Sequence, residues 1–235
     1  IYWDDFILTD ATGNSYLNSI EPDFINEIQV MKGPQGGEMG TETGGVMILK
    51  SHLKNETNAT LTAGSYDQFS EKINFSKTLG AHHLTVGQSH YQSNGYRQQS
   101  AMKRTSFYLN DLWKYNTKNT LNFKAFYTNL GYETPGGLTR EQMLLNRKQA
   151  RLATATLPSA ETQNAAIYNK TFLGGMAHIW NINKNWTQFS LIQTSFTNLK
   201  NPFISNFEER KEFNVQGRFY VNHEREYTYL FSRTR

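Results

Sequence analysis

The chain has 235 residues, of which 37% are hydrophobic, 19% charged and 14% aromatic, and its formal net charge is +4. It contains no cysteine, which excludes disulfides and thiolate metal sites, and its positive charge is too diffuse to indicate a nucleic-acid partner. No apolar run reaches the ~18 residues that a membrane helix requires. Membrane-spanning strands remain compatible with this composition, because they alternate apolar and polar residues.

The first 24 residues predict a strand at 1–3, a turn cluster at 11–15 and a short helix at 21–25. Asp4 and Asp5 directly follow the strand. We interpret them as a solvated strand end, and the rival interpretation is a pair of metal-binding or catalytic carboxylates.

Residues 25–50 predict two strands joined by a glycine-rich connection. Alternating apolar residues over 25–30 end at a turn, and a second apolar strand begins at Val46. A phosphate-binding loop is the rival interpretation, but the glycines lack the G-x-x-x-x-G-K-[ST] spacing and no helical pattern follows them. The residues that define this structural motif are Lys32, Gly33, Pro34, Gly40, Gly44 and Gly45.

The hydrophobic period changes to two after the polar linker 51–57 and stays there. About nine antiparallel strands are predicted, most of them near the ~9–11 residues of a tilted membrane strand. Short connections alternate with long ones along the chain. The strands are expected at 57–66, 69–79, 83–91, 104–113, 121–130, 167–180, 186–196, 212–221 and 227–231, and the long connections at 92–103, 131–166 and 197–211.

Large aromatic residues flank the short turns, where the aromatic girdle of a membrane barrel would lie. They are Trp113, Tyr115, Trp180 and Trp186. A soluble β-sandwich would explain the alternation of the strands. It would explain neither the unequal loops nor the position of these side chains.

The segment 25–50 resembles the end of the plug domain in the TonB-dependent outer-membrane receptors, where a VxKGPxxxxYGxxxxGGVINI pattern closes the plug before the barrel begins. Val30, Val46 and Ile48 fall on that pattern together with the six motif residues, while Met39 replaces the usual aromatic residue. The resemblance implies an all-β chain. Residues 1–52 would be the C-terminal part of an α+β plug domain, and residues 53–235 the N-terminal part of an incomplete transmembrane β-barrel.

The long connection at 131–166 contains a predicted helix. Thr139 and Gln142 form a T-x-x-Q capping box, which predicts about three helical turns over 140–151 with basic residues at the C-terminal end. The run 134–160 resembles the large outer loop of iron-complex receptors in the same family, with its TPGGLTxEQ…ARxATxTLPxA pattern. Candidate ligand-binding residues are Arg140, Arg147, Lys148 and Arg151, although the same cations would also suit the helix end and a solvated surface.

No catalytic, cofactor or metal site is predicted, and the chain is not expected to be an enzyme. The neighbours His82 and His83 face opposite sides of a strand, and ~27 Å of extended strand separates His82 from His90. We therefore interpret all three as turn and rim histidines.

The resemblance implies a fragment of a transporter in the outer membrane of a Gram-negative bacterium, which takes up a ferric siderophore or a similar iron complex. Its partners would be outer-membrane lipid, the iron complex, and the TonB complex through a segment absent from this chain. The alternatives are a ligand-sensing receptor, a transporter of cobalamin, haem or a glycan, and a soluble β-sandwich binding module.

Overall fold

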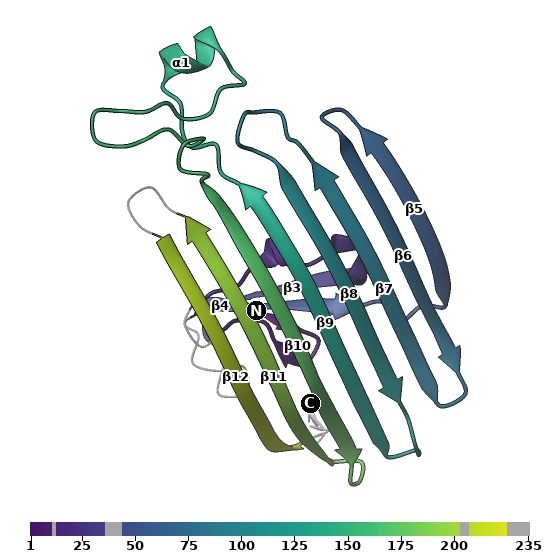
Figure 1. Ribbon diagram of the computed structural model, residues 1–235. Helices are drawn as coiled ribbons and strands as arrows, with labels where there is room; N and C mark the ends of the chain where they lie inside the picture. Colours follow the sequence, from purple (N-terminus) through teal and green to yellow (C-terminus); the bar gives the residue numbers. More distant parts are fainter. Residues whose placement is uncertain (11–12, 36–43, 203–206, 225–235) are drawn as a thin grey trace, which may run out of the picture.

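The computed structural model describes residues 1–10, 13–35, 44–202 and 207–224. Two sheets account for most of the regular structure of these residues: a small four-stranded sheet and a large eight-stranded sheet, here called the wall. Figure 1 shows the small sheet lying against one face of the wall, with its strands running across those of the wall. None of the helices in the described residues is long and apolar enough to cross a membrane.

The small sheet has the strand order β2-β1-β4-β3, and only the β1–β4 pair is parallel. Two single turns of 3-10 helix, η1 and η2, lie between β2 and β3, and η2 confirms the short helix that the sequence predicts at 21–25. The elements are β1 (Tyr2–Trp3), β2 (Phe6–Ile7), η1 (Leu17–Ser19), η2 (Pro22–Phe24), β3 (Ile25–Lys32) and β4 (Gly45–Ser51).

The predicted strands on either side of the glycine-rich connection pair with each other, from Lys32 opposite Gly45 to Ile25 opposite Ser51. Gly45 has φ +131°, and a Cβ atom there would overlap the carbonyl oxygen of Met31. Only glycine fits this position without strain. Gly40 lies outside the described residues.

The wall consists of eight antiparallel strands in chain order, each hydrogen-bonded to the next, and it does not close on itself. An incomplete antiparallel barrel is therefore confirmed, and the predicted ninth strand at 227–231 lies outside the described residues. The strands are β5 (Glu56–Gly64), β6 (Gln68–Leu79), β7 (His82–Ser93), β8 (Met102–Trp113), β9 (Asn119–Glu133), β10 (Ala166–Asn181), β11 (Trp186–Pro202) and β12 (Phe207–His223).

The two ends of the wall differ. Short turns join the strands at one end, and the connections 94–101 and 134–165 lie at the other, here called the loop end (Figure 1). The predicted long connection at 197–211 is wrong. β11 and β12 remain paired as far as Pro202 opposite Phe207, so only residues 203–206 separate them.

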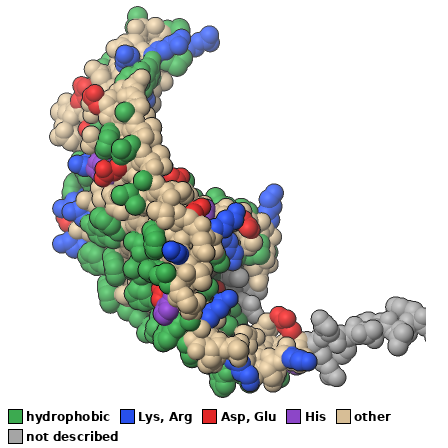
Figure 2. Space-filling view, turned by 90° about the vertical axis from the view of Figure 1, so that its right-hand side faces the viewer, with side chains coloured by type: hydrophobic (Ala, Val, Ile, Leu, Met, Phe, Trp, Pro, Cys, Tyr) green, Lys and Arg blue, Asp and Glu red, His purple; other side chains and the backbone are tan. Residues whose placement is uncertain are grey.

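The two faces of the wall also differ. Apolar side chains such as Phe107, Ile192 and Phe213 project from the convex face and are 50–70% exposed. Figure 2 shows hydrophobic side chains gathered on that face, while the small sheet occupies the concave side. The main core lies between the two sheets, where Trp3 stacks on Tyr108 of the wall at 4.5 Å between ring centroids.

Candidate functional site

The interface between the small sheet and the concave face of the wall contains two clusters of buried charge. The first is built around Lys124 of β9, whose side chain is fully buried. Its ammonium lies 2.6 Å from the Asp4 carboxylate, 3.1 Å from Ser51 Oγ and 3.4 Å from the hydroxyl of Tyr108. The same ammonium lies 4.6 Å from the centroid of the Trp3 ring, so aromatic faces complete its enclosure.

Asp4 belongs to this first cluster, so its interpretation as a solvated strand end is wrong. Ser51 donates to its carboxylate through both the backbone N–H (3.0 Å) and the hydroxyl (2.5 Å). Burial alone would raise the pKa of Asp4, but the Lys124 ammonium and the bonds from Ser51 outweigh that effect and hold the pKa below its ordinary value. Burial raises the pKa of the neighbouring Asp5, against the opposing charge of Arg218.

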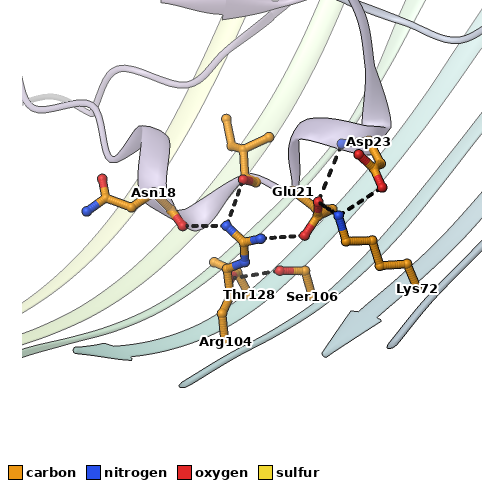
Figure 3. Close-up of polar contacts among 8 residues, drawn as sticks. Asn18, Glu21, Asp23, Lys72, Arg104, Ser106 and Thr128 are labelled. Atoms are coloured by element: carbon orange, nitrogen blue, oxygen red, sulfur yellow. Dashed lines mark hydrogen bonds and ion pairs between the residues drawn. The ribbon is translucent and has the colours of Figure 1, made fainter. Parts of the chain in front are cut away.

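The second cluster joins residues 17–24 to the wall (Figure 3). Arg104 of β8 forms an ion pair with Glu21 and donates to the carbonyl oxygens of Asn18 and Ile20, both at 3.0 Å. Lys72 of β6 lies 2.8 Å from Glu21 and 2.9 Å from Asp23. One buried carboxylate therefore receives two cations from different strands of the wall.

Two further contacts hold β2 and the turn before it near the other edge of the wall. The amide of Gln193 pairs with the backbone of Ile7, accepting from its N–H at 2.8 Å and donating to its carbonyl at 2.9 Å. Arg218 donates to the carbonyl oxygen of Asp5 at 3.0 Å. The two bonds of Gln193 satisfy the backbone of Ile7 at the edge of β2, as a neighbouring strand would.

The clusters are built to hold the small sheet in one position. Each wall residue that supplies a contact projects from the concave face at an alternate position of its strand, as the two-residue period requires. The cost of burying these charges is offset only while their partners stay in place. The ion pairs and hydrogen bonds of this interface therefore hold the small sheet against the wall, and displacing the small sheet would leave cations unpaired on the wall.

Sequence reasoning missed these wall residues. Arg104 and Lys124 each interrupt a run of apolar and small polar side chains at an inward-facing position, and that interruption was the available signal. Their partners could not be identified, because Glu21 lies 83 residues from Arg104 and Asp4 lies 120 residues from Lys124.

The structural motif of the glycine-rich segment lies away from both clusters. Lys32 ends β3, Gly33 has φ +78°, and Pro34 is exposed. The side chain of Gln35 donates to the carbonyl oxygens of Lys32 and Gly33, which closes the turn. Gly44 is exposed and directly precedes β4.

The four predicted ligand-binding residues lie in the connection 134–165 at the loop end, but they do not form one group. The capping box of Thr139 and Gln142 is confirmed. The predicted length of the helix is wrong, because α1 (Arg140–Leu145) has only six residues and ends at Asn146. Arg147, Lys148 and Arg151 therefore lie beyond the helix and do not complement its dipole.

The chain leaves the helical path after residue 146 because it docks on the neighbouring connection 94–101. Gln98 N–H donates to the carbonyl of Lys148 at 2.7 Å, and the Arg97 guanidinium donates twice to the carbonyl of Gln149, at 2.9 and 3.1 Å. The Lys148 ammonium lies 5.9 and 5.8 Å from the ring centroids of two tyrosines, Tyr66 and Tyr96.

Arg151 is also engaged within its own connection, donating to the side chain of Gln163 at 2.6 Å. The side chains of Arg140 and Arg147 are exposed, and no ion pair or hydrogen bond of either is found among the described residues. These two cations can therefore approach a ligand from solvent, whereas Lys148 and Arg151 help to order the loop.

The three histidines each have a local partner. His82 lies 2.9 Å from the Asp111 carboxylate and stacks on Trp113, His83 contacts Ser76, and His90 contacts Thr105 at 2.9 Å. In the part of the chain that the structure describes, no three of the side chains able to bind a metal come together.

Several solved structures share this arrangement. The ferric citrate transporter FecA in its unliganded form matches with a TM-score of 0.62 at 15% identity, over 82% of this chain and 30% of that chain. The siderophore receptor PiuA from Acinetobacter baumannii matches with a TM-score of 0.63 at 13% identity, over 85% of this chain and 29% of that chain. FpvA of P. aeruginosa, bound to heterologous pyoverdines, matches with a TM-score of 0.62 at 13% identity, over 85% of this chain and 28% of that chain.

The chain thus spans less than a third of the length of these three structures. No protein-family model matches the chain, and no curated protein matches its sequence. At such low identity the structural likeness establishes the fold alone: an incomplete barrel wall with a small sheet against its inner face.

Proposed function

We propose that this chain, whose fold is that of the TonB-dependent siderophore and iron-complex receptors, is part of an outer-membrane transporter that takes up a ferric siderophore or a similar iron complex. In this proposal residues 1–52 are the C-terminal part of the plug and residues 53–235 are the N-terminal part of the barrel. The break between the two sheets, after Ser51 and before Glu56, supports that division.

One observation carries the proposal: the wall presents its apolar face away from the small sheet. A soluble β-sandwich buries the apolar faces of its sheets against each other. Here Ile192 and Phe213 point outward, while Lys124 and Arg104 point inward and are buried against the small sheet. Apolar side chains outside and polar ones inside are the arrangement of a barrel wall that faces lipid.

The aromatic residues at the turn end support the same orientation. Trp113 and Trp186 are half-exposed on the convex face, and Trp113 packs on Tyr115 at 5.3 Å between ring centroids. Such a belt suits the boundary between hydrocarbon and water. The short turns would then face the periplasm and the connection 134–165 the outside of the cell.

An iron complex is the cargo that the comparisons favour, because the similar structures include a ferric citrate transporter and several siderophore receptors. Arg140 and Arg147 would draw such a complex by its negative charge. The small sheet closes the concave side of the wall, so uptake would require an energy source that displaces it, which is the part assigned to the TonB complex.

The test is uptake by the whole receptor that contains this chain. Gram-negative cells without iron-complex receptors of their own would carry its gene, in strains with and without TonB. They would be given iron-55 as its citrate, a catecholate and a hydroxamate complex. We expect the protein in the outer-membrane fraction and TonB-dependent uptake of at least one complex. A protein in the soluble fraction, or one that takes up none of the three, would overturn the proposal, and tight binding without uptake would indicate a sensing receptor instead.

A further inference from the structure

A continuous row of hydroxyl side chains crosses the concave face of the wall. Ser89 lies opposite Ser106, Ser106 opposite Thr128, Thr128 opposite Thr171, and Thr171 opposite Thr197. The row therefore places one hydroxyl on each of five consecutive strands, β7 to β11. We call these five residues the hydroxyl row. Charged residues continue it on both sides, with Lys72 opposite Ser89 and Glu212 opposite Thr197.

Four of the five members of the hydroxyl row are buried, and Thr171 is partly exposed. Ser106 and Thr128 have no exposed surface, and their oxygens lie 3.2 Å apart; those of Thr171 and Thr197 lie 3.3 Å apart. The row two positions nearer the turn end contains Tyr108, Phe126 and Leu173 at the equivalent strands, and these side chains fill the interface. Because large side chains fit the interface in that neighbouring row, burial alone does not explain why the hydroxyl row has small polar ones.

Residues 17–24, which lie between β2 and β3 of the small sheet, cover the hydroxyl row. Figure 3 shows Ser106 and Thr128 beside Arg104, beneath the segment that Arg104 and Lys72 hold through Glu21. A cavity already separates the row from that segment on the β10–β11 side. Its lining includes Leu17, Ser19, Ile20, Thr171, Ser195 and Thr197.

We propose that the hydroxyl row is a band of the wall that the cargo contacts as it passes, after residues 17–24 are displaced. This inference rests on the proposed function and adds a defined site within it. The ligand class is an iron complex whose periphery carries oxygen acceptors, as carboxylate, catecholate and hydroxamate groups do. Each hydroxyl can rotate to donate to such an oxygen or accept from a donor. Several weak, neutral contacts at this level favour passage, because no single one retains the complex.

The second cluster of buried charge is the release point in this scheme. Asp23 is 56% exposed and Lys72 is 27% exposed at their side chains, so water can solvate these groups as they separate. The Glu21 and Arg104 side chains of the same cluster are only 2% and 10% exposed, so water reaches the cluster first at the Lys72–Asp23 pair. Separation at Glu21 would uncover the hydroxyl row while β1 and β4 remain attached to the wall.

The first experiment compares two double variants of the whole receptor. In Ser106→Ala with Thr128→Val the row loses two hydroxyls with little change in volume. In the matched control, Ser76→Ala with Thr85→Val, an equally buried pair at 3.0 Å outside the row is treated identically. Iron-55 uptake is measured with whichever of the citrate, catecholate or hydroxamate complexes the wild type transports.

We expect the row variant to lower the maximal uptake rate by about fivefold or more, since two hydrogen-bonding positions are lost, with binding at the cell surface unchanged. The control should stay within about twofold of the wild type, since it leaves the row intact. Equal effects in both variants would overturn the inference while leaving the proposed function standing. Absence of wild-type uptake of any complex would overturn both.

The second experiment asks whether the hydroxyl row becomes accessible. Residues 1–235 contain no cysteine, so Thr128→Cys introduces the one thiol of this part of the receptor, and the unsubstituted receptor gives the background labelling. In whole cells, a membrane-impermeant maleimide should label this thiol only when TonB and the transported complex are both present. Glu21→Gln, which weakens the hold of Arg104 and Lys72, should increase labelling in the absence of cargo. Labelling that is the same with and without TonB and cargo, or that Glu21→Gln does not change, would contradict the inference.

Discussion

The Lys124 ammonium lies 2.6 Å from the Asp4 carboxylate, although Lys124 belongs to the wall, Asp4 to the turn between β1 and β2 of the small sheet, and 120 positions separate them in the chain. The Lys124 side chain has no exposed surface, so this pair joins the interior of the small sheet to the interior of the wall. Ser51 completes the contact from β4. The position of the small sheet thus depends on a charge that water cannot reach.

Asp4→Asn should weaken the docking of the small sheet by about 3–5 kcal/mol, because it leaves the Lys124 charge buried without its counter-charge. The double variant Asp4→Asn with Lys124→Met should recover most of that loss, because it removes the charge altogether. Hydrogen exchange of the β1 and β4 amides in the purified whole receptor measures both effects. A double variant no more stable than Asp4→Asn would show that the unpaired Lys124 charge does not cause the weaker docking of the small sheet.

The contribution of Asp4 should also depend on pH. Its folded-state pKa is lower than its ordinary value of 3.8, so its stabilisation is complete above that value and is lost as the pH falls through the lowered folded-state pKa. The pKa of Asp5 is shifted upward, so its ionised form destabilises the folded state, and this destabilisation diminishes as the pH falls and Asp5 takes up a proton. The difference in unfolding free energy between wild type and Asp4→Asn isolates the contribution of Asp4.

That difference should stay constant from about pH 7 to about pH 5 and shrink below 3.8, where Asp4 of the unfolded chain takes up a proton while Asp4 of the folded protein is still ionised. Denaturant unfolding of the two proteins at a series of pH values measures it. A difference that already shrinks above pH 5 would mean that Lys124 and Ser51 do not dominate over burial.

The alternating pattern was sufficient to predict the strands of the wall, because the strands from β6 to β11 expose one face and bury most of the other. In β9, Phe123 and Tyr127 face outward and Lys124 and Phe126 face inward, as a period of two requires. Turn chemistry likewise predicted the two strands on either side of the glycine-rich connection, which form β3 and β4. These are local properties, and a single sequence contains them.

The contacts that hold the small sheet against the wall could not be predicted in the same way. Whether Asp4 is solvated or buried depends on a lysine that the fold brings to it from β9, and no pattern near residue 4 indicates that contact. The helix α1 shows the same limit. Its capping box is local and was predicted, but its end is set by the docking of Gln149 on Arg97.

The basic residues of the connection 134–165 should separate into two functional classes. The double variant Arg140→Ala with Arg147→Ala should leave the loop folded, because neither side chain has a partner among the described residues. It should slow the association of an anionic iron complex several-fold at low salt and by less at ~0.15 M salt, since screening weakens steering.

The matched control for that variant is Arg151→Ala, which removes the bond to Gln163 and so loosens the loop itself. Stopped-flow binding gives the association rates, and limited proteolysis reports loop order. Equal association rates for the double variant and wild type at low salt would exclude Arg140 and Arg147 from ligand capture.

The convex face offers a direct measurement of whether the wall lies in lipid. Ile192 and Asn198 both project from that face of β11, with Ile192 in the apolar zone and Asn198 nearer the loop end. A lysine in place of a residue near the bilayer midplane costs about 2–4 kcal/mol, and near the interface only about 0–1 kcal/mol. Ile192→Lys should therefore sharply reduce assembly of the whole receptor in lipid vesicles, and Asn198→Lys should hardly change it. Folding yield, read from the heat-dependent shift in gel mobility, gives the comparison. If the two variants fold equally well, the apolar face does not meet the hydrocarbon core, and the assignment of this wall to a membrane barrel fails with it.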